Sequence, residues 1–352
     1  MESNAAHNLL GRTLANGWEI IELIKKMPGQ TGSFFSVCYK VERDGEVCFL
    51  KAFDFAKFFH VSQVSGQNKS VVDVMSDMIN AYKYERDLSD LCKSKRVTKV
   101  AFVKEAGEEM VSGFTIPVVP YLIFDLADGD IRKKLFYSNN LDLAWKLKSL
   151  HSVAVGLRQL HNINVSHQDL KPSNVLLFKE ESKIGDIGRS LSSDLKSPFD
   201  QTIFNGDWSY APPELLYRYY IEEWKKRVFA TDCYLLGSMI VFYFAGVNMN
   251  ALIRKHLPDA VSWEYWTGTF SDVKDYLVDA FRHALVDIEL SISDDYLKKE
   301  ISMLIGYLCN PIPEKRGHIK TINSQVNQYE LERFVSKLAL LHEKARYKLI
   351  NE

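Results

Sequence analysis

The hydrophobic pattern of the chain changes once along its length, from a strand-like period near the start to a helical period later. Between residues 18 and 54, apolar positions alternate with polar or mixed ones. Turn signals at 28–32 and at 44–45 interrupt the alternation, which predicts a meander of short strands. From Pro213 to the last residue the spacing is mainly helical. We therefore expect an α+β fold that opens with a sheet and continues as helices.

Further elements are expected between these two regions. Apolar residues recur every three or four positions from 71 to 91, which predicts a helix whose apolar stripe ends at Glu85. Strands are predicted at 100–103 and 115–124, on either side of a turn-rich segment at 104–113. Long amphipathic helices are expected over 141–161 and near the end of the chain.

Length and charge limit the kinds of protein this can be. The 352 residues suggest two domains or one large two-lobed unit, at about 150 residues per domain. Lys and Arg total 44 and Asp and Glu total 45, for a net charge of −1. No basic field points to nucleic acid or to an anionic membrane as partner.

Cysteine usage and the first residues bear on the compartment. The five cysteines are scattered without a CxxC pair, which argues against a disulfide framework and a zinc site. Residues 1–13 lack the basic and apolar runs of a secretory signal, so we expect a reducing, cytoplasmic location. The apolar run at 234–247 is shorter than the ~20 residues that a bilayer needs, and we expect a buried helix and no membrane span.

The chemistry is concentrated in two polar clusters between short apolar runs. Residues 167–174 read HQDLKPSN, and residues 186–188 read DIG, with Asp186 twelve positions after Asn174. Asp and Asn often cap turns, which is the alternative interpretation of Asp169 and Asn174. Eight nearly consecutive matches to one pattern, together with the spaced DxG, favour a catalytic role instead.

These clusters resemble the catalytic loop and the metal-binding loop of eukaryotic-type (Hanks-type) serine/threonine protein kinases. The resemblance covers roughly residues 18–320 and implies a two-lobed fold, with a sheet-rich N-lobe holding one helix and a larger helical C-lobe. It implies that Asp169 accepts the proton of the attacking hydroxyl and that Lys171 steadies the transferred phosphate. Asn174 and Asp186 would hold Mg²⁺, or Mn²⁺, together with the phosphates of ATP.

A buried lysine and a helical glutamate are a candidate pair in the first lobe. Lys51 lies in an apolar strand, where a charge is costly unless it is paired, and Glu85 is its natural partner. A solvated helix residue is the alternative for Glu85. In the family such a lysine grips the α and β phosphates and is held by the glutamate. The 33 residues between the two exceed the usual separation, so we expect an insertion at 55–70.

The remaining nucleotide-binding candidates match the family less closely. Residues 30–37 align with the glycine-rich loop only at Gly32 and at the final Val37, and an ordinary hairpin turn is the alternative. Residues 124–127 resemble the hinge against which adenine stacks. By this resemblance Phe124 is the gatekeeper, Asp125 and Ala127 contact the base, and Asp130 reaches the ribose. A plain edge strand followed by a linker is the alternative there.

Three later residues match structural positions of the family. Residues 206–214 (GDWSYAPPE) resemble the end of the activation segment. Asp232 resembles the aspartate that opens the central buried helix, and Arg316 resembles the arginine that pairs with Glu214. They agree with the other motifs in their order along the chain, which strengthens the resemblance.

Three positions depart from the family pattern. Gln168 replaces the arginine that binds a phosphorylated activation loop, so we expect activity without phosphorylation of that loop. Asp207 stands where a threonine is usual, which bears on peptide selection. Phe49 replaces a small alanine above adenine and would crowd the pocket, and the small Gly185 would open compensating space.

The expected function is transfer of the γ-phosphate of ATP to protein serine or threonine hydroxyls, including autophosphorylation. Lys171 favours serine/threonine over tyrosine specificity by the same resemblance. A nucleotide-binding pseudokinase and, less favoured, a small-molecule kinase are the alternatives. Partners would be ATP, a protein substrate and a regulatory protein. The expected divisions are an extension at 1–17, an N-lobe at 18–125, a C-lobe at 126–325 and a final helix at 326–352.

Overall fold

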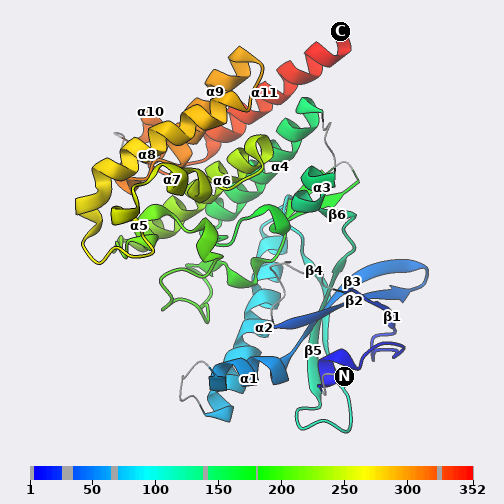
Figure 1. Cartoon of the computed structure of the whole chain (residues 1–352). Helices are drawn as coiled ribbons and strands as arrows, with labels where there is room; N and C mark the ends of the chain where they lie inside the picture. Colours follow the sequence, from blue (N-terminus) through cyan, green and yellow to red (C-terminus); the bar gives the residue numbers. More distant parts are fainter. Residues whose placement is uncertain are drawn as a thin grey trace.

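The computed structural model describes residues 4–25, 35–64, 70–137, 142–179, 181–322 and 327–351. The chain forms two lobes (Figure 1). A sheet lobe, up to Asp125, contains one five-stranded sheet and two helices, and a helical lobe follows it. The predicted α+β, two-lobed fold is confirmed. The division of the chain into the four expected segments stays a prediction.

The sheet of the first lobe is antiparallel, with strand order β1-β2-β3-β5-β4. Its strands are β1 (Glu19–Leu23), β2 (Ser36–Arg43), β3 (Glu46–Phe53), β4 (Val103–Met110) and β5 (Val118–Asp125). The tight turn between β2 and β3 uses Asp44 and Gly45, both with positive φ. Tyr39, Leu50 and Tyr121 are almost fully buried on one face of this sheet.

The strand β4 is a correction to the sequence-based expectation. A strand was expected at 100–103 and turns at 104–113, yet β4 begins at Val103 and runs to Met110. It lies at the edge of the sheet and pairs only with β5. An edge strand tolerates polar side chains because one of its sides faces water. Its Lys104 and Glu108 are exposed, which is why its composition looked like that of a turn.

Two helices flank the sheet, one more than the resemblance implied. The described part of the expected insertion at 55–70 forms α1 (Phe55–Val64), which packs against α2 (Val71–Ser94). Helix α2 begins with a capping box, in which Ser70 and Asp73 satisfy each other's backbone N–H groups. This cap fixes the start of the helix that carries Glu85.

Residues before the expected N-lobe take part in its core. Ala5, Leu9 and Leu14 are buried against the sheet, and the hydroxyl of Tyr39 donates a 2.8 Å hydrogen bond to the carbonyl of Ala6. The amide of Asn4 donates to Asp54 at 3.0 Å. The described part of residues 1–17 is therefore packed on the sheet.

The helical lobe is built around α6 (Figure 1). Its other helices of seven or more residues are α3 (Ile131–Tyr137), α4 (Leu143–Asn162), α7 (Met249–His256), α8 (Phe270–Leu290), α9 (Asp295–Leu308) and α11 (Glu332–Asn351). One short strand, β6 (Gly129–Asp130), comes before α3. Four more lie between α4 and α5: β7 (Val165–Ser166), β8 (Val175–Phe178), β9 (Glu181–Ile184) and β10 (Leu191–Ser192). Single turns form α5 (Pro213–Leu216) and α10 (Ile319–Ile322).

Helix α6 (Trp224–Ala245) is long and apolar enough to cross a membrane, but 83% of its most apolar window is buried inside the protein. A core helix passes the same test of length and composition. The helix expected at 234–247 is present, but α6 begins ten residues earlier, at Trp224, and ends at Ala245, where Gly246 caps it with a positive φ. Helix α11, at the end of the chain, packs on α4, where His342 bonds the carbonyl of Ala144 at 2.9 Å.

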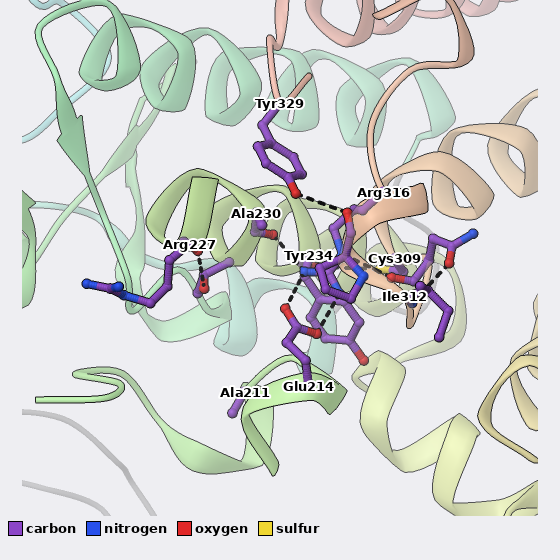
Figure 2. A network of polar contacts seen from close by, with 12 residues as sticks. Ala211, Glu214, Arg227, Ala230, Tyr234, Cys309, Ile312, Arg316 and Tyr329 are labelled. Carbon is purple, nitrogen blue, oxygen red and sulfur yellow. Dashed lines mark hydrogen bonds and ion pairs between the residues drawn. The ribbon is translucent and has the colours of Figure 1, made fainter. Parts of the chain in front are cut away.

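A buried ion pair joins α5 to the loop after α9 (Figure 2). Arg316 donates to the two carboxylate oxygens of Glu214 at 2.7 Å each, and the side chains are 0% and 2% exposed. Arg316 also donates to the carbonyls of Ala230 and Asn310, at 3.0 Å each. Burial opposes its charge, but Glu214 outweighs burial and raises the pKa of Arg316. The predicted pairing of Arg316 with Glu214 is present.

Replacing Glu214 by alanine should destabilise the helical lobe by about 3–5 kcal/mol, because it leaves a buried guanidinium without its counter-charge. Urea unfolding followed by circular dichroism measures this loss. Glu223→Ala is the matched control, since it removes an exposed pair with Lys226 and should cost less than about 1 kcal/mol. Equal losses of unfolding free energy in the two variants would contradict a special stabilising role of the buried pair.

Candidate functional site

Lys51 of β3 lies between two carboxylates where the two lobes meet. Its Nζ is 3.0 and 2.9 Å from the carboxylate oxygens of Glu85 and 3.1 Å from Oδ1 of Asp186. The predicted pair of Lys51 with Glu85 is therefore present. Burial opposes the charge of Lys51, but the two carboxylates outweigh it and raise its pKa. Lys51 in turn lowers the pKa of Asp186, so both groups are charged.

The candidate residues of the catalytic loop gather around Asp169. The Asn174 amide donates to Asp169 twice, to its carbonyl at 2.8 Å and to Oδ2 at 3.1 Å. Lys171 lies 3.2 Å from Oδ1 of Asp169. Burial raises the pKa of Asp169, and Lys171 offsets only part of this effect. A carboxylate with a raised pKa is suited to accept a proton near neutral pH.

Hydrogen bonds to Asp232 of α6 anchor the catalytic loop. The backbone N–H groups of His167 and Gln168 donate to the two Asp232 oxygens at 2.8 and 2.9 Å. His161, from the end of α4, contacts the same carboxylate at 2.8 Å. Burial opposes ionisation, but these bonds hold the pKa of Asp232 below its usual range. Sequence reasoning missed His161, which is 71 positions from Asp232 and carries no local signal.

Asp207 makes contacts that the sequence did not predict. Its backbone N–H donates to Oδ1 of Asp169 at 2.8 Å, and its Oδ2 lies 3.4 Å from Nζ of Lys171. Burial opposes its ionisation, but bonds from Ser209 and the charge of Lys171 lower its pKa. Gly206 makes the approach feasible, since a Cβ there would lie 2.2 Å from the carbonyl oxygen of Gln168. Lys171 is thus held between two carboxylates.

The side chain of Gln168 points into the protein interior. It is 3% exposed, and its amide donates to Oγ of Ser166 at 2.7 Å and to the carbonyl of Val228 at 3.1 Å. The segment after Asp186 is tied elsewhere: Arg189 donates to the carbonyl of Asn205 at 2.7 Å, and the Asn205 amide returns a bond of 3.3 Å. Gln168 therefore has no part in tethering this segment.

The other predicted nucleotide-binding residues lie around this centre. Val37 is buried in β2 and pairs with Ala52, beside Lys51. Asp125 ends β5 with an exposed side chain, and Ala127 follows it. The Asp130 carboxylate accepts the backbone N–H of Lys133 at 3.0 Å, at the start of α3. The predicted Gly32 and the rest of the turn at 28–32 lie outside the described residues.

Gly185 is closely packed. A Cβ at this position would lie 2.7 Å from Cδ1 of Leu176, so the small residue leaves room for that side chain. The compensating space expected beneath the base stays a prediction. Phe49 lies on the same face of β3 as Lys51 and is paired with Phe124 of β5. The two ring centroids are 6.2 Å apart. Two aromatic rings therefore lie next to each other where the resemblance places the adenine.

The residues proposed for a metal fit such a group by their chemistry. Lys51 engages Oδ1 of Asp186, while a third of the Asp186 side chain remains exposed. The Asn174 amide nitrogen is turned to Asp169. Its side-chain oxygen accepts a long 3.4 Å bond from Oγ of Ser173 and retains a second lone pair for another partner. A carboxylate and an amide oxygen are ligands that Mg²⁺ and Mn²⁺ accept.

Comparison with known proteins agrees with this geometry. The model of the protein kinase domain matches residues 59–326, which is most of the chain. The chain belongs to the protein kinase family. Its kinase domain is 25% identical to human serine/threonine-protein kinase H2 over 236 residues, covering 63% of this chain and 58% of that protein.

Two further relatives are serine/threonine kinases or kinase subunits. Serine/threonine-protein kinase PKH3 of Eremothecium gossypii is 31% identical over 137 residues, covering 36% of this chain and 18% of the relative. The inhibitor of nuclear factor kappa-B kinase subunit alpha of Xenopus laevis is 28% identical over 216 residues, covering 58% and 26%. The kinase domain thus spans less than two thirds of the length of these relatives.

Replacing Phe49 by alanine should tighten ATP binding by the kinase about tenfold, or ~1.4 kcal/mol, because it removes one of two rings from the adenine side of the cleft. Isothermal titration calorimetry measures the change. Val47→Ala is the matched control, since Val47 is a partly exposed residue two positions earlier on the same face of β3. Unchanged or weaker ATP binding by Phe49→Ala would refute the hypothesis that the Phe49 ring crowds the adenine.

Proposed function

We propose that the chain is an active ATP-dependent protein serine/threonine kinase that also phosphorylates itself. The observation that carries the proposal is the joint presence of two networks. In one, Lys51 is held by Glu85 and Asp186, and in the other Asp169 is held by Asn174 and Lys171. A domain that only binds nucleotide has no need of a buried proton acceptor beside a cation.

In the proposed reaction, Asp169 orients the acceptor hydroxyl and takes its proton. The hydroxyl oxygen forms a bond to the γ-phosphorus, and the bond from that phosphorus to the bridging oxygen of ADP breaks. Lys171 offsets the negative charge on the transferred group, and Lys51 binds the phosphates that remain on ADP. Because Asn174 and Asp207 both donate to Asp169, its carboxylate is already oriented before the acceptor arrives.

Mg²⁺ or Mn²⁺, when bound, would neutralise phosphate charge. Asn174 and Asp186 are the residues that we assign to hold it. The contact of Asp186 with Lys51 supports this assignment, because it keeps the Asp186 carboxylate ionised and oriented.

Protein acceptors are favoured over small molecules by residues 206–214. This segment leads into α5 and is anchored there by the buried pair of Glu214 and Arg316. A braced segment beside Asp169 is suited to support a peptide chain. Similarity to the serine/threonine-protein kinases H2 and PKH3 supports serine/threonine specificity for the same site.

A pseudokinase remains the second candidate, and Phe49 and Asp207 favour it. Phe49 places a second ring beside Phe124, where the resemblance places the adenine. Asp207 places a second carboxylate against Lys171 and so reduces the charge that Lys171 offers to a phosphate. Such a protein would bind nucleotide without turnover.

Phosphate transfer from labelled ATP, with Mg²⁺ or Mn²⁺ present, distinguishes the active kinase from the pseudokinase. We expect label on the wild-type protein and on a generic basic protein. Asp169→Asn and Asp186→Asn should each lose at least about a hundredfold in rate, because one removes the proton acceptor and the other a metal ligand. Asp90→Asn, at an exposed position on α2, is the control and should transfer normally. ATP binding without label anywhere would favour the pseudokinase.

Activity should also survive removal of phosphate from the activation segment. The buried amide of Gln168 cannot pair with a phosphate, and Arg189 and Asn205 already tie the two ends of this segment together. Phosphatase-treated protein should therefore keep most of its transfer rate relative to protein treated with heat-killed phosphatase. A large loss of rate would contradict this.

A further inference from the structure

A wide groove lies in the helical lobe, between α8, α9 and α10. Its volume is about 880 Å³, which is ample for several side chains of a bound peptide. These three helices are on the side of the helical lobe that faces away from the sheet (Figure 1). The residues that line the groove include none of those assigned to phosphate transfer.

The residues that line the groove include an apolar set, which we call its floor, and a charged set, which we call its rim. Phe281 and Val278 contribute from α8, Met303 and Tyr307 from α9, and Ile319 from α10. Met303 is 37% exposed and Ile319 is 59% exposed. Large apolar side chains gathered in one concave surface are typical of a binding site, whereas single exposed ones are not.

The rim of the groove carries an excess of positive charge. Its cations are Arg282, Lys298, Lys299 and Lys315, and its carboxylates are Glu289 and Asp295. Within the described part of the chain, only Lys298 among these four cations has an ion-pair partner, Asp295, at 3.1 Å. The whole chain has a net charge of −1, so this surplus is local.

One wall of the groove is rigid. Asn310 and Lys315 belong to the loop that Arg316 anchors: Arg316 donates to the carbonyl of Asn310 at 3.0 Å and pairs with the buried Glu214 (Figure 2). A wall held by a buried ion pair is in place before any partner arrives. Binding to a preformed site costs less ordering free energy than binding to a mobile one.

From these observations we propose that the groove docks an acidic peptide segment of a partner protein, with large apolar side chains entering the floor and carboxylates facing the basic rim. The apolar floor disfavours a nucleic acid, and the concave shape disfavours a flat membrane surface. Docking here does not depend on phosphate transfer, because Asp169 and Lys51 have no part in the groove. A segment held at this site would raise the local concentration of its protein at the kinase.

Selection from a phage-displayed library of random peptides tests the proposal on the full chain. We expect enriched peptides to combine acidic residues with large apolar ones. Fluorescence anisotropy of the enriched peptides should show at least about tenfold weaker binding to Lys299→Glu/Lys315→Glu and to Met303→Glu. Lys225→Glu/Lys226→Glu makes the same change of charge at exposed positions of α6 and should bind like wild type.

The outcomes separate docking from catalysis. Asp169→Asn should bind the peptides as wild type does, whether or not the wild type transfers phosphate. Unchanged thermal midpoints would show that the groove variants are folded. Failure to enrich any peptide, enrichment of basic ones, or equal binding by the wild type and the groove variants would overturn the proposal.

Discussion

The buried carboxylate of Asp232 is the interaction on which the site depends. It is 0% exposed and accepts bonds from the backbone of His167 and Gln168 and from the ring of His161. A buried carboxylate is stable only when hydrogen bonds replace the water that it has lost. Because Asp232 needs all three donors, it holds them in fixed positions. This anchors the loop that carries Asp169 to α6, a helix with 15 of its 22 residues buried.

The second constraint joins the two lobes. Lys51 comes from the sheet, while Asp186 follows β9 in the helical lobe, and their 3.1 Å contact spans the junction. Glu85 of α2 is the second carboxylate beside Lys51. The ammonium group of Lys51 is therefore neutralised only when β3, α2 and the segment after β9 are all correctly placed. The charge that would bind phosphate is therefore also one of the contacts that join the lobes, beside the 2.7 Å bond from the Tyr84 hydroxyl to the carbonyl of Ser190.

Sequence reasoning succeeded where a side chain has one chemically sensible use. The buried lysine required a carboxylate, and the apolar stripe ending at Glu85 supplied it. It failed where local composition and tertiary position disagree. The polar strand β4 looked like a turn because an edge strand has a solvent side.

The sequence by itself determined the family, the order of sheet and helices, and the residue types at the centre, because reactive side chains and their spacing are local properties. Only the tertiary structure decided that Gln168 turns inward, that Asp207 reaches Lys171, and that a basic-rimmed groove forms between α8, α9 and α10. These depend on contacts between residues distant in sequence, whose geometry is set by packing of the whole chain and leaves no periodic signal.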